Sequence, residues 1–335
     1  MDGIINVYKE KGYTSHDVVA KMRGILRMKK IGHTGTLDPA AEGVLPVCLG
    51  KGTRLCDMLT DKTKSYRAVL LLGKETDTQD TTGTVLAENP EAAEALTEEA
   101  VREAVMSFLG HYMQVPPMYS ALKVNGKKLY ELARAGKEIE RQARPVEILD
   151  IQIEEIALPR VTFHVSCSKG TYIRTLCYDI GRKLGCGGCM ESLLRTRVDR
   201  FRLEDSLTLS QIEALRDEGR VEEHVLPVDS VFLDYPKFCM KPGEGDKLVH
   251  NGNPFRDAEE LFTVESGENR TAADAGTAEP ERDGNSCCFT VRVYDSEDQF
   301  IGLYQYEEEK QRYRPQKIFL GGKYASNHRN QGVSD

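Results

Sequence analysis

The sequence contains no run of 18 uncharged apolar residues, and no apolar signal core near its N-terminus. A helix needs about 20 apolar residues to cross a bilayer, and a secretory signal needs an apolar core of about 7 to 15. We therefore expect a soluble, cytoplasmic protein that binds no membrane. No internal repeat is evident either, which argues against a solenoid or propeller.

The sequence also lacks a convincing metal site. Cys186 and Cys189 have the spacing of a zinc knuckle, but Cys287 and Cys288 are adjacent and cannot supply a second one. The nine cysteines are an odd number, which indicates reduced thiols in a cytosolic chain. We expect no metal and no cofactor. The neighbouring glycines are expected to end a helix and turn the chain: Gly185, Gly187 and Gly188.

Positive charge is scarce overall, with 45 Lys and Arg against 53 Asp and Glu and a net charge of −8. It is unevenly distributed, because residues 1–80 and 111–203 together carry nine more basic than acidic residues, whereas the remainder is strongly acidic. A local positive field, rather than net charge, is what attracts a polyanion. The distribution is therefore compatible with nucleic-acid binding, although solvated surface would explain it equally well.

Apolar periodicity predicts a mixture of helices and strands, and the length of 335 residues favours two domains. Ser15 is expected to cap a helix with apolar positions up to Leu26, and Thr97 to cap another within 96–109. A third helix is expected to begin at Thr171. The predicted strands are 44–49, 66–72, 161–167, 289–294 and 300–306, the second of them buried on both faces.

A loop from Gly32 to Pro39, with the sequence Gly-His-Thr-Gly-Thr-Leu-Asp-Pro, carries the carboxylate Asp38. Proline disfavours helical geometry for the residue before it, so Asp38 is biased toward an extended conformation. Asp-Pro alone is a common turn opener and proves little without its context.

That context consists of ordered motifs downstream, namely Lys64-Ser-Tyr-Arg-Ala68, Thr76-Asp-Thr-Gln-Asp80, Pro117-Met-Tyr-Ser-Ala-Leu-Lys123, Gly126-Lys-Lys-Leu-Tyr130 and Lys169-Gly-Thr-Tyr-Ile-Arg-Thr175. In order and spacing, over roughly residues 3–230, the sequence resembles the TruB family of tRNA pseudouridine synthases. The resemblance implies an α+β fold of pseudouridine-synthase type, with a mixed, largely antiparallel sheet flanked by helices.

The resemblance also implies a chemistry, the isomerisation of uridine 55 to pseudouridine in the TΨC arm of tRNA. Asp38 would be the catalytic carboxylate acting on a flipped nucleotide. Arg174 would pair with Asp38 and keep it ionised and aimed, since an unpartnered buried carboxylate tends to take up a proton. Tyr66 would stack on the uracil and assist proton removal.

Further residues match the family less sharply. His33 would accompany nucleotide flipping, Asp80 would orient its neighbours, and Tyr172 and Lys9 would line the pocket. Glu10 departs from the family, which usually has proline after the lysine, and this puts the position of Lys9 in doubt.

Residues 111–145 form a predicted basic insertion with seven Lys or Arg and three Tyr. Cations suit phosphates and flat side chains suit unpaired bases, so we expect this segment to bind RNA. The lysines expected to contact phosphates are Lys123, Lys127 and Lys128.

The C-terminal part differs in character. Position and length suggest a small PUA-like β domain over 231–325, interrupted by a flexible acidic insertion at 264–286 and followed by a tail, 326–335. The catalytic domain would cover 1–230.

Three other functions are alternatives to pseudouridine formation in tRNA. A guide-RNA-dependent relative of the Cbf5/dyskerin type shares the Gly-Thr-Leu-Asp-Pro core but works in a ribonucleoprotein, and the basic insertion argues against it. A tRNA-folding chaperone would not need Asp38, Tyr66 and Arg174, although both activities could coexist. A metal-dependent RNA hydrolase lacks clustered ligands. We expect tRNA, bound through its T arm, as the partner of a monomer that needs no protein partner.

The first prediction concerns metal removal. Pseudouridine formation should persist in excess EDTA without nucleotide cofactors, measured on RNA that was folded without magnesium, because the sequence offers no metal-ligand set. A loss in EDTA that zinc restores would instead identify Cys186 and Cys189 as ligands.

Overall fold

The computed structural model describes residues 1–124, 126–265 and 289–320. The chain divides into two compact units. The larger contains residues 5–47 and 55–223, and the smaller contains residues 1–4, 48–54 and the described part of 224–335. The assignment of 1–230 and 231–325 to catalytic and RNA-binding domains remains a prediction, and so does the tail.

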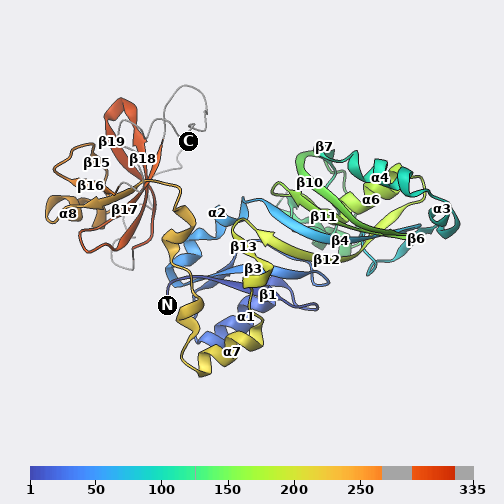
Figure 1. Cartoon of the computed structure of the whole chain (residues 1–335), viewed down its shortest axis with the longest axis horizontal. Helices are drawn as coiled ribbons and strands as arrows, with labels where there is room; N and C mark the ends of the chain where they lie inside the picture. The colour runs from blue at the N-terminus through green and yellow to red at the C-terminus, as the bar shows by residue number, and fades with distance from the viewer. Residues whose placement is uncertain (125, 266–288, 321–335) are drawn as a thin grey trace. The chain divides into compact units, whose positions relative to one another are not determined.

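A nine-stranded sheet forms the body of the larger unit, with the central order β1-β3-β12-β4-β11-β10-β7 (Figure 1). Strand β12 runs parallel to β3, and every pair from β12 to β7 is antiparallel. The predicted mixed, largely antiparallel sheet is therefore confirmed. Its strands are β1 (Gly3–Lys9), β2 (Ile31–His33), β3 (Glu42–Leu49), β4 (Lys64–Leu72), β7 (Gly110–Gln114), β10 (Arg144–Ala157), β11 (Arg160–Cys167), β12 (Gly188–Val198) and β13 (Phe201–Arg202).

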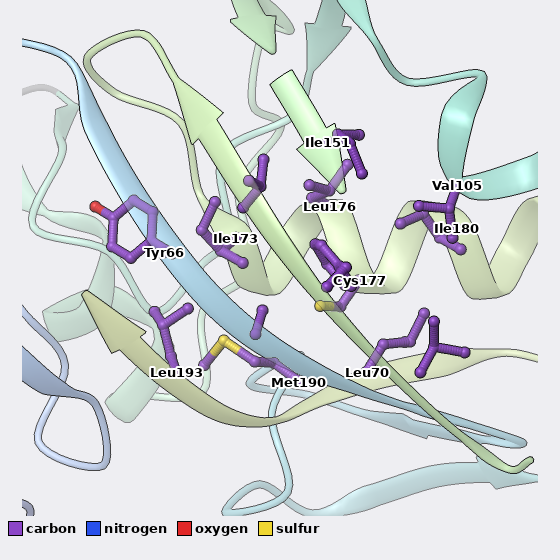
Figure 2. Close-up of a cluster of buried hydrophobic side chains, with 14 of the residues drawn as sticks. Tyr66, Leu70, Val105, Ile151, Ile173, Leu176, Cys177, Ile180, Met190 and Leu193 are labelled. Atoms are coloured by element: carbon purple, nitrogen blue, oxygen red, sulfur yellow. The ribbon is translucent and has the colours of Figure 1, made fainter. Parts of the chain in front are cut away.

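Helix α6 (Ile173–Lys183) covers one face of the sheet at β4 and β12, and its buried residues join those of the strands in one apolar core. Figure 2 shows Ile173, Leu176 and Ile180 pointing from α6 toward that core. The other helices of the larger unit are α1 (Ser15–Leu26), α2 (Cys56–Thr60), α3 (Pro90–Glu94), α4 (Glu98–Met106), α5 (Leu129–Arg134) and α7 (Leu209–Asp217).

Two predicted helix caps are displaced by one residue. Thr14, not Ser15, is the N-cap of α1. Its side chain accepts a hydrogen bond from Asp17 N, and the Asp17 carboxylate accepts one from Thr14 N, which together form a capping box. Tyr172, not Thr171, precedes α6. Thr97 caps α4 as predicted. Two hydroxyl residues stood side by side at the first site, and only the backbone conformation distinguished them.

Strand β4 was predicted to be buried on both faces, and this is wrong. Its residues alternate between buried and intermediate along the whole strand, because α6 packs against one of its faces and the other face is less covered. Leucine and valine on the other side, such as Val69 and Leu71, are only partly covered. A run of apolar residues does not reveal which faces have a partner.

The predicted basic insertion contains regular structure. Strand β7 lies within it and pairs with the start of β10, and Lys123–Val124 (β8) pairs with Lys127–Lys128 (β9) in a short hairpin. A second short hairpin joins β5 (Lys74–Thr76) to β6 (Val85–Glu88).

The smaller unit contains a six-stranded sheet of order β15-β19-β18-β17-β14-β16, which packs around an aromatic-rich core. Both predicted C-terminal strands are present. Most of the expected acidic insertion, and the tail, lie outside the described residues. The elements are β14 (Lys237–Met240), α8 (Glu244–His250), β15 (Phe255–Arg256), β16 (Phe262–Glu265), β17 (Thr290–Tyr294), β18 (Phe300–Glu307) and β19 (Arg312–Ile318).

Glycine at position 181 brings α6 unusually close to β12. A Cβ atom there would lie 2.2 Å from Gly188 N, in the backbone of the turn that begins β12. Gly185 and Gly187 in this turn adopt positive φ, of 76° and 78°, as expected of glycines after a helix. The helix can therefore approach the strand only because Gly181 has no side chain.

The second prediction follows from this approach. Gly181→Ala should destabilise the protein by about 1–3 kcal/mol, because backbone must move to admit the methyl group. The matched control is Gly24→Ala in α1, where nothing lies within 4 Å of the added Cβ. Alanine has the higher helix propensity, so this change should stabilise by up to about 1 kcal/mol. Urea unfolding measures both, and equal effects would contradict the close approach.

Candidate active site

Asp38 lies on the loop between β2 and β3. The loop is tied down on both sides of the residue, because Ser15 Oγ accepts a hydrogen bond from Leu37 N at 2.9 Å and Lys9 Nζ donates to Pro39 O at 3.3 Å. The Asp38 side chain is 36% exposed. A carboxylate is thus presented to solvent on a restrained backbone.

Arg174, from the first turn of α6, holds this carboxylate at two points. Its Nε lies 2.9 Å from Asp38 Oδ2, and its Nη2 donates to Asp38 Oδ1 at 3.3 Å. The Arg174 side chain is only 6% exposed. Two parallel charge-assisted bonds fix the orientation of the carboxylate as well as its distance.

The rest of the guanidinium is held by two loops. Nη1 donates to Thr78 O at 2.9 Å, and Nη2 donates to Tyr119 O at 2.8 Å. Nη1 also lies 3.8 Å from Asp80 Oδ2. Since both atoms bonded are backbone carbonyls, these contacts leave no signature in the sequence.

Asp80 organises the loop that supplies one of the carbonyls. Its Oδ1 accepts hydrogen bonds from Thr78 Oγ1 at 2.8 Å and from Thr82 N at 2.9 Å. The same loop bonds to β12, where Met190 N donates to Gln79 O at 3.0 Å. Asp80 therefore lies beside Arg174 and holds Thr78, as its predicted orienting role requires.

Burial raises the pKa of Asp38 above its ordinary value. The charge of Arg174 opposes this rise, and Lys9 does so more weakly, whereas Asp80 adds to it. Arg174 therefore favours the ionised form, as expected, but it does not outweigh burial.

Tyr66 lies on β4, directly in the sheet, and is 7% exposed. Figure 2 shows its ring at one end of the apolar core, with the hydroxyl pointing away from the labelled side chains. Burial raises its pKa to about 12, and the nearby Arg195 opposes the shift. At neutral pH the residue is a phenol.

Lys9 is fully buried, and Nζ donates to Glu10 O at 3.1 Å as well as to Pro39 O. Burial lowers its pKa to about 8, although Glu42 and Asp38 oppose the shift. The departure from proline at Glu10 leaves this contact intact, because the acceptor is a carbonyl that either residue provides.

His33 donates through Nδ1 to Gly35 O at 3.0 Å, since a carbonyl can only accept. Burial lowers its pKa, which favours the neutral ring with an accepting Nε2. Tyr172 is held through its backbone, because Gln114 Oε1 accepts from Tyr172 N at 2.8 Å and Gln114 Nε2 donates to Tyr172 O at 3.1 Å.

Lys123, Lys127 and Lys128 lie together on the β8–β9 hairpin, where Lys123 and Lys128 are direct partners. Within the described residues, no hydrogen bond or ion pair joins them to Asp38 or Arg174. Backbone hydrogen bonds connect the residues that flank the hairpin to the segment next to Tyr119: Leu129 N donates to Leu122 O, and Tyr130 N donates to Ser120 O.

Two buried polar residues of the site were not singled out from the sequence. Gln114 is 1% exposed and holds the backbone that precedes α6, and Arg195 is 1% exposed and lies beside Tyr66. An isolated glutamine or arginine in a strand carries no pattern that distinguishes it from a surface residue.

Within the described ranges, no group of three or more His, Cys, Asp or Glu is arranged to hold a metal ion. Cys186 and Cys189 are both buried. None of the described helices is long and apolar enough to cross a membrane.

Fold comparison defines the class of protein. The chain superimposes on a protein in the crystal structure of a Cbf5-Nop10-Gar1 complex with a TM-score of 0.65 and 26% identity, covering 95% of this chain and 85% of the other. A chain in a structure of an H/ACA RNP bound to a substrate RNA shares the fold at 24% identity and the same TM-score. With the carboxylate-arginine pair, this is the pseudouridine-synthase fold.

Family models and relatives narrow the class. Residues 23–173 match the N-terminal domain of the TruB family pseudouridylate synthases, and residues 174–233 match the C-terminal domain of tRNA pseudouridylate synthase B. The chain is 52% identical to tRNA pseudouridine synthase B of Lachnoclostridium phytofermentans over 96% of its length and all of the relative's, and 42% identical to that of Clostridium tetani over 92% and 97%. The chain belongs to the TruB family of pseudouridylate synthases.

The third prediction uses the buried cation at the site. Because the pKa of Lys9 falls from 10.5 to about 8 on folding, the unfolded chain binds more protons between these values. Stability therefore rises with pH in that window. Relative to Lys9→Met, the wild-type protein should gain stability from pH 8 to pH 10, measured by urea unfolding. The exposed Lys11→Met is the matched control, and a pH-independent difference for Lys9→Met would contradict the lowered pKa.

Proposed function

We propose that this protein isomerises uridine 55 in the TΨC loop of tRNA to pseudouridine, with Asp38 as the catalytic carboxylate. The observation that carries the proposal is the two-point clamp of Asp38 by Arg174. Relatives that cover nearly the whole chain are named tRNA pseudouridine synthase B, which supports tRNA as the substrate.

The reaction exchanges one bond to the sugar for another. The bond from N1 of uracil to C1′ breaks, the base turns, and a bond from C5 to C1′ forms. N1 gains a proton and C5 loses one, so no redox cofactor or energy source is needed. Asp38 would act at the sugar or the base, and Arg174 would hold it in the orientation that this requires.

Neighbouring residues would position the flipped nucleotide. Tyr66 would stack on the uracil and assist the removal of the C5 proton. His33 would fill the space left by the flipped base. Its neutral ring could also accept a hydrogen bond through Nε2. Asp80 would orient Arg174, and Tyr172 and Lys9 would line the pocket.

Recognition of the T arm would use the basic hairpin. Lys123 and Lys127 are exposed and Lys128 is partly exposed, so these lysines can reach phosphates. Tyr130 lies beneath the Lys128 ammonium group, 5.4 Å from Nζ to the ring centroid. The smaller unit, as a PUA-like domain, would add a second RNA contact. We expect a cytoplasmic monomer that needs no cofactor and no protein partner.

A guide-RNA-dependent mode of action is the main alternative. The fold neighbours are chains from RNA–protein and protein complexes, but they are only 24–26% identical, whereas the relatives named tRNA pseudouridine synthase B are 42–52% identical. A tRNA-folding chaperone activity would use the same binding surface and could accompany catalysis. Assay of the purified chain on tRNA alone separates these possibilities.

The fourth prediction tests the proposal. Purified protein should convert the T-loop uridine of an unmodified tRNA transcript, mapped by carbodiimide-dependent reverse-transcription stops. Asp38→Asn should abolish this stop but bind tRNA as tightly as the wild type, because it removes a charge without changing volume.

Retention of more than about one per cent of the wild-type rate, a loss of less than about 3 kcal/mol of barrier, would show that Asp38 is not the catalytic carboxylate. The absence of any stop with the wild-type chain, and its appearance when a guide RNA is added, would favour the guided mode.

The fifth prediction concerns the basic hairpin. Replacing Lys123, Lys127 and Lys128 by alanine should weaken tRNA binding and flatten its salt dependence. Each phosphate contact on flexible RNA contributes roughly 0.7 to the magnitude of the logarithmic salt slope, so this magnitude should decrease by about two. Filter binding at several salt concentrations measures both quantities.

The matched control replaces the same three lysines by arginine, which keeps the charges and should keep the slope. Single-turnover rates of the alanine variant should largely recover at saturating tRNA, because within the described residues no hydrogen bond or ion pair joins these lysines to Asp38. Unchanged affinity and slope in the alanine variant would place the RNA-binding surface elsewhere.

A further inference from the structure

Arg195 heads the set of largest fully buried side chains in the described part of the chain, with 1% of its surface exposed. It lies on β12 in the middle of the nine-stranded sheet. In the strand register, its partner on β4 is Tyr66 and its partner on β3 is Gly43. Cross-strand partners in an antiparallel pair have their Cβ atoms about 5 Å apart. The sheet itself therefore brings Arg195 beside the active-site tyrosine.

A buried arginine is almost always paired with a carboxylate. Over the described ranges, no carboxylate lies within ion-pair distance of Arg195. Its Nε donates to Val44 O at 2.7 Å, and its Nη2 is buried without a hydrogen-bond partner. Burying a charge in this way costs several kcal/mol. A structural role alone does not require a cation here, because an apolar side chain would fill the same space more cheaply.

The surrounding backbone is adapted to this arrangement. Gly43 has φ 103°, and a Cβ atom at that position would lie 2.2 Å from Arg195 O. Strand β3 can therefore approach β12 at this point only because residue 43 is glycine. The same approach puts Val44 O within reach of Arg195 Nε and holds the guanidinium close to the sheet.

The group that Arg195 acts on is the Tyr66 hydroxyl. Tyr66 is the cross-strand partner of Arg195, the charge of the guanidinium favours the ionised phenol, and Tyr66 in turn favours the charged guanidinium. A guanidinium can only donate hydrogen bonds. In a hydrogen bond between the two groups, the phenolic oxygen would therefore be the acceptor.

We propose that Arg195 is a positioning residue for Tyr66: it donates to the phenolic oxygen, holds that oxygen in place beside the substrate, and stabilises the negative charge that forms on it during the reaction. This inference rests on the proposed function, and specifically on the role of Tyr66 in removing the C5 proton. For Tyr66 to take the C5 proton, the phenol must first give its own O–H proton to solvent water. When the C5–H bond then breaks, its electron pair returns to the uracil ring and the phenolate takes the proton, which restores the neutral phenol. Arg195 favours this step because a neighbouring cation stabilises the phenolate.

A double-mutant cycle tests whether Arg195 acts through the hydroxyl. Arg195→Met removes the cation and keeps an unbranched, flexible side chain that can fill much of the same space. In the wild-type background it should lower the single-turnover rate at saturating tRNA by 10- to 100-fold, with a change in Kd of less than threefold. In the Tyr66→Phe background, which lacks the hydroxyl, it should change the residual rate by less than threefold.

The matched control is Arg197→Met, an exposed arginine two residues along the same strand, which should leave the rate unchanged. An equal loss in both backgrounds would mean that Arg195 acts independently of Tyr66, and an unchanged rate in Arg195→Met would mean that it has no role in the reaction. Either result overturns the proposal.

A second measurement does not depend on turnover. In protein labelled with ¹³C at Cζ of tyrosine, the Tyr66 signal is the one that disappears in Tyr66→Phe. This signal reports the hydrogen bonding and ionisation of the phenol. It should move in Arg195→Met and stay in place in Arg197→Met.

Arg195→Lys covers the case in which methionine prevents folding, since it retains a cation at the position but lacks the planar fork. It too should shift the Tyr66 signal, and it should lower the rate less than methionine does. A signal and a rate that both match the wild type in Arg195→Lys would overturn the proposal.

The two proposals fail in different ways. If the wild-type chain forms no pseudouridine in tRNA, the proposed function is wrong, while the spectroscopic contact between Arg195 and Tyr66 can still be present. If tRNA is modified normally but the Tyr66 signal ignores Arg195, only the positioning role is wrong.

Discussion

The contact between Arg174 and Asp38 is the interaction on which the site depends. One guanidinium bonds both oxygens of Asp38 and the carbonyls of Thr78 and Tyr119. Three segments that are far apart in the sequence, and the first turn of α6, thus meet on one planar group. An arginine can do this because its donors are arranged in a rigid fork. A single side chain consequently places the Asp38 carboxylate, the Asp80 loop and the segment that leads into the basic hairpin relative to one another.

The sheet provides the rigidity that this arrangement needs. Strand β12 holds the Asp80 loop through Met190, packs against α6 where Gly181 allows a close approach, and carries Arg195 opposite Tyr66. Residues on regular elements are held more accurately than residues on free loops. Asp38 lies on a loop, and this loop is restrained by Ser15 and Lys9, at the ends of α1 and β1.

Three buried cations in and near the site are electrostatically unfavourable for folding. Lys9 and Arg195 are fully buried, and Lys64 is 9% exposed. Burial lowers the pKa of Lys9 and of Lys64 to about 8. All three cations bond to backbone carbonyls, for example Lys64 Nζ to Thr60 O at 2.8 Å. Replacing such a buried cation by a hydrophobic residue is often expected to favour folding. Groups with strongly shifted pKa values cluster at functional sites. Lys9 interacts electrostatically with Asp38, and Arg195 is the cross-strand partner of Tyr66.

The sequence by itself determined the local elements and the chemistry-bearing residues. Periodicity located most helices and strands, because burial on one face imposes a repeat on apolar residues, and the ordered motifs around Asp38, Tyr66 and Arg174 indicated the family. Only the tertiary structure decided the rest. Thr78 O, Tyr119 O and Val44 O take part through the backbone, which every residue possesses, so no motif marks them. Gln114 and Arg195 became informative only once their burial was known. The partial covering of β4 could not be predicted, because the sequence of a strand does not show where the helices will lie. Contacts across the fold depend on which surfaces meet, and a local pattern contains no record of that.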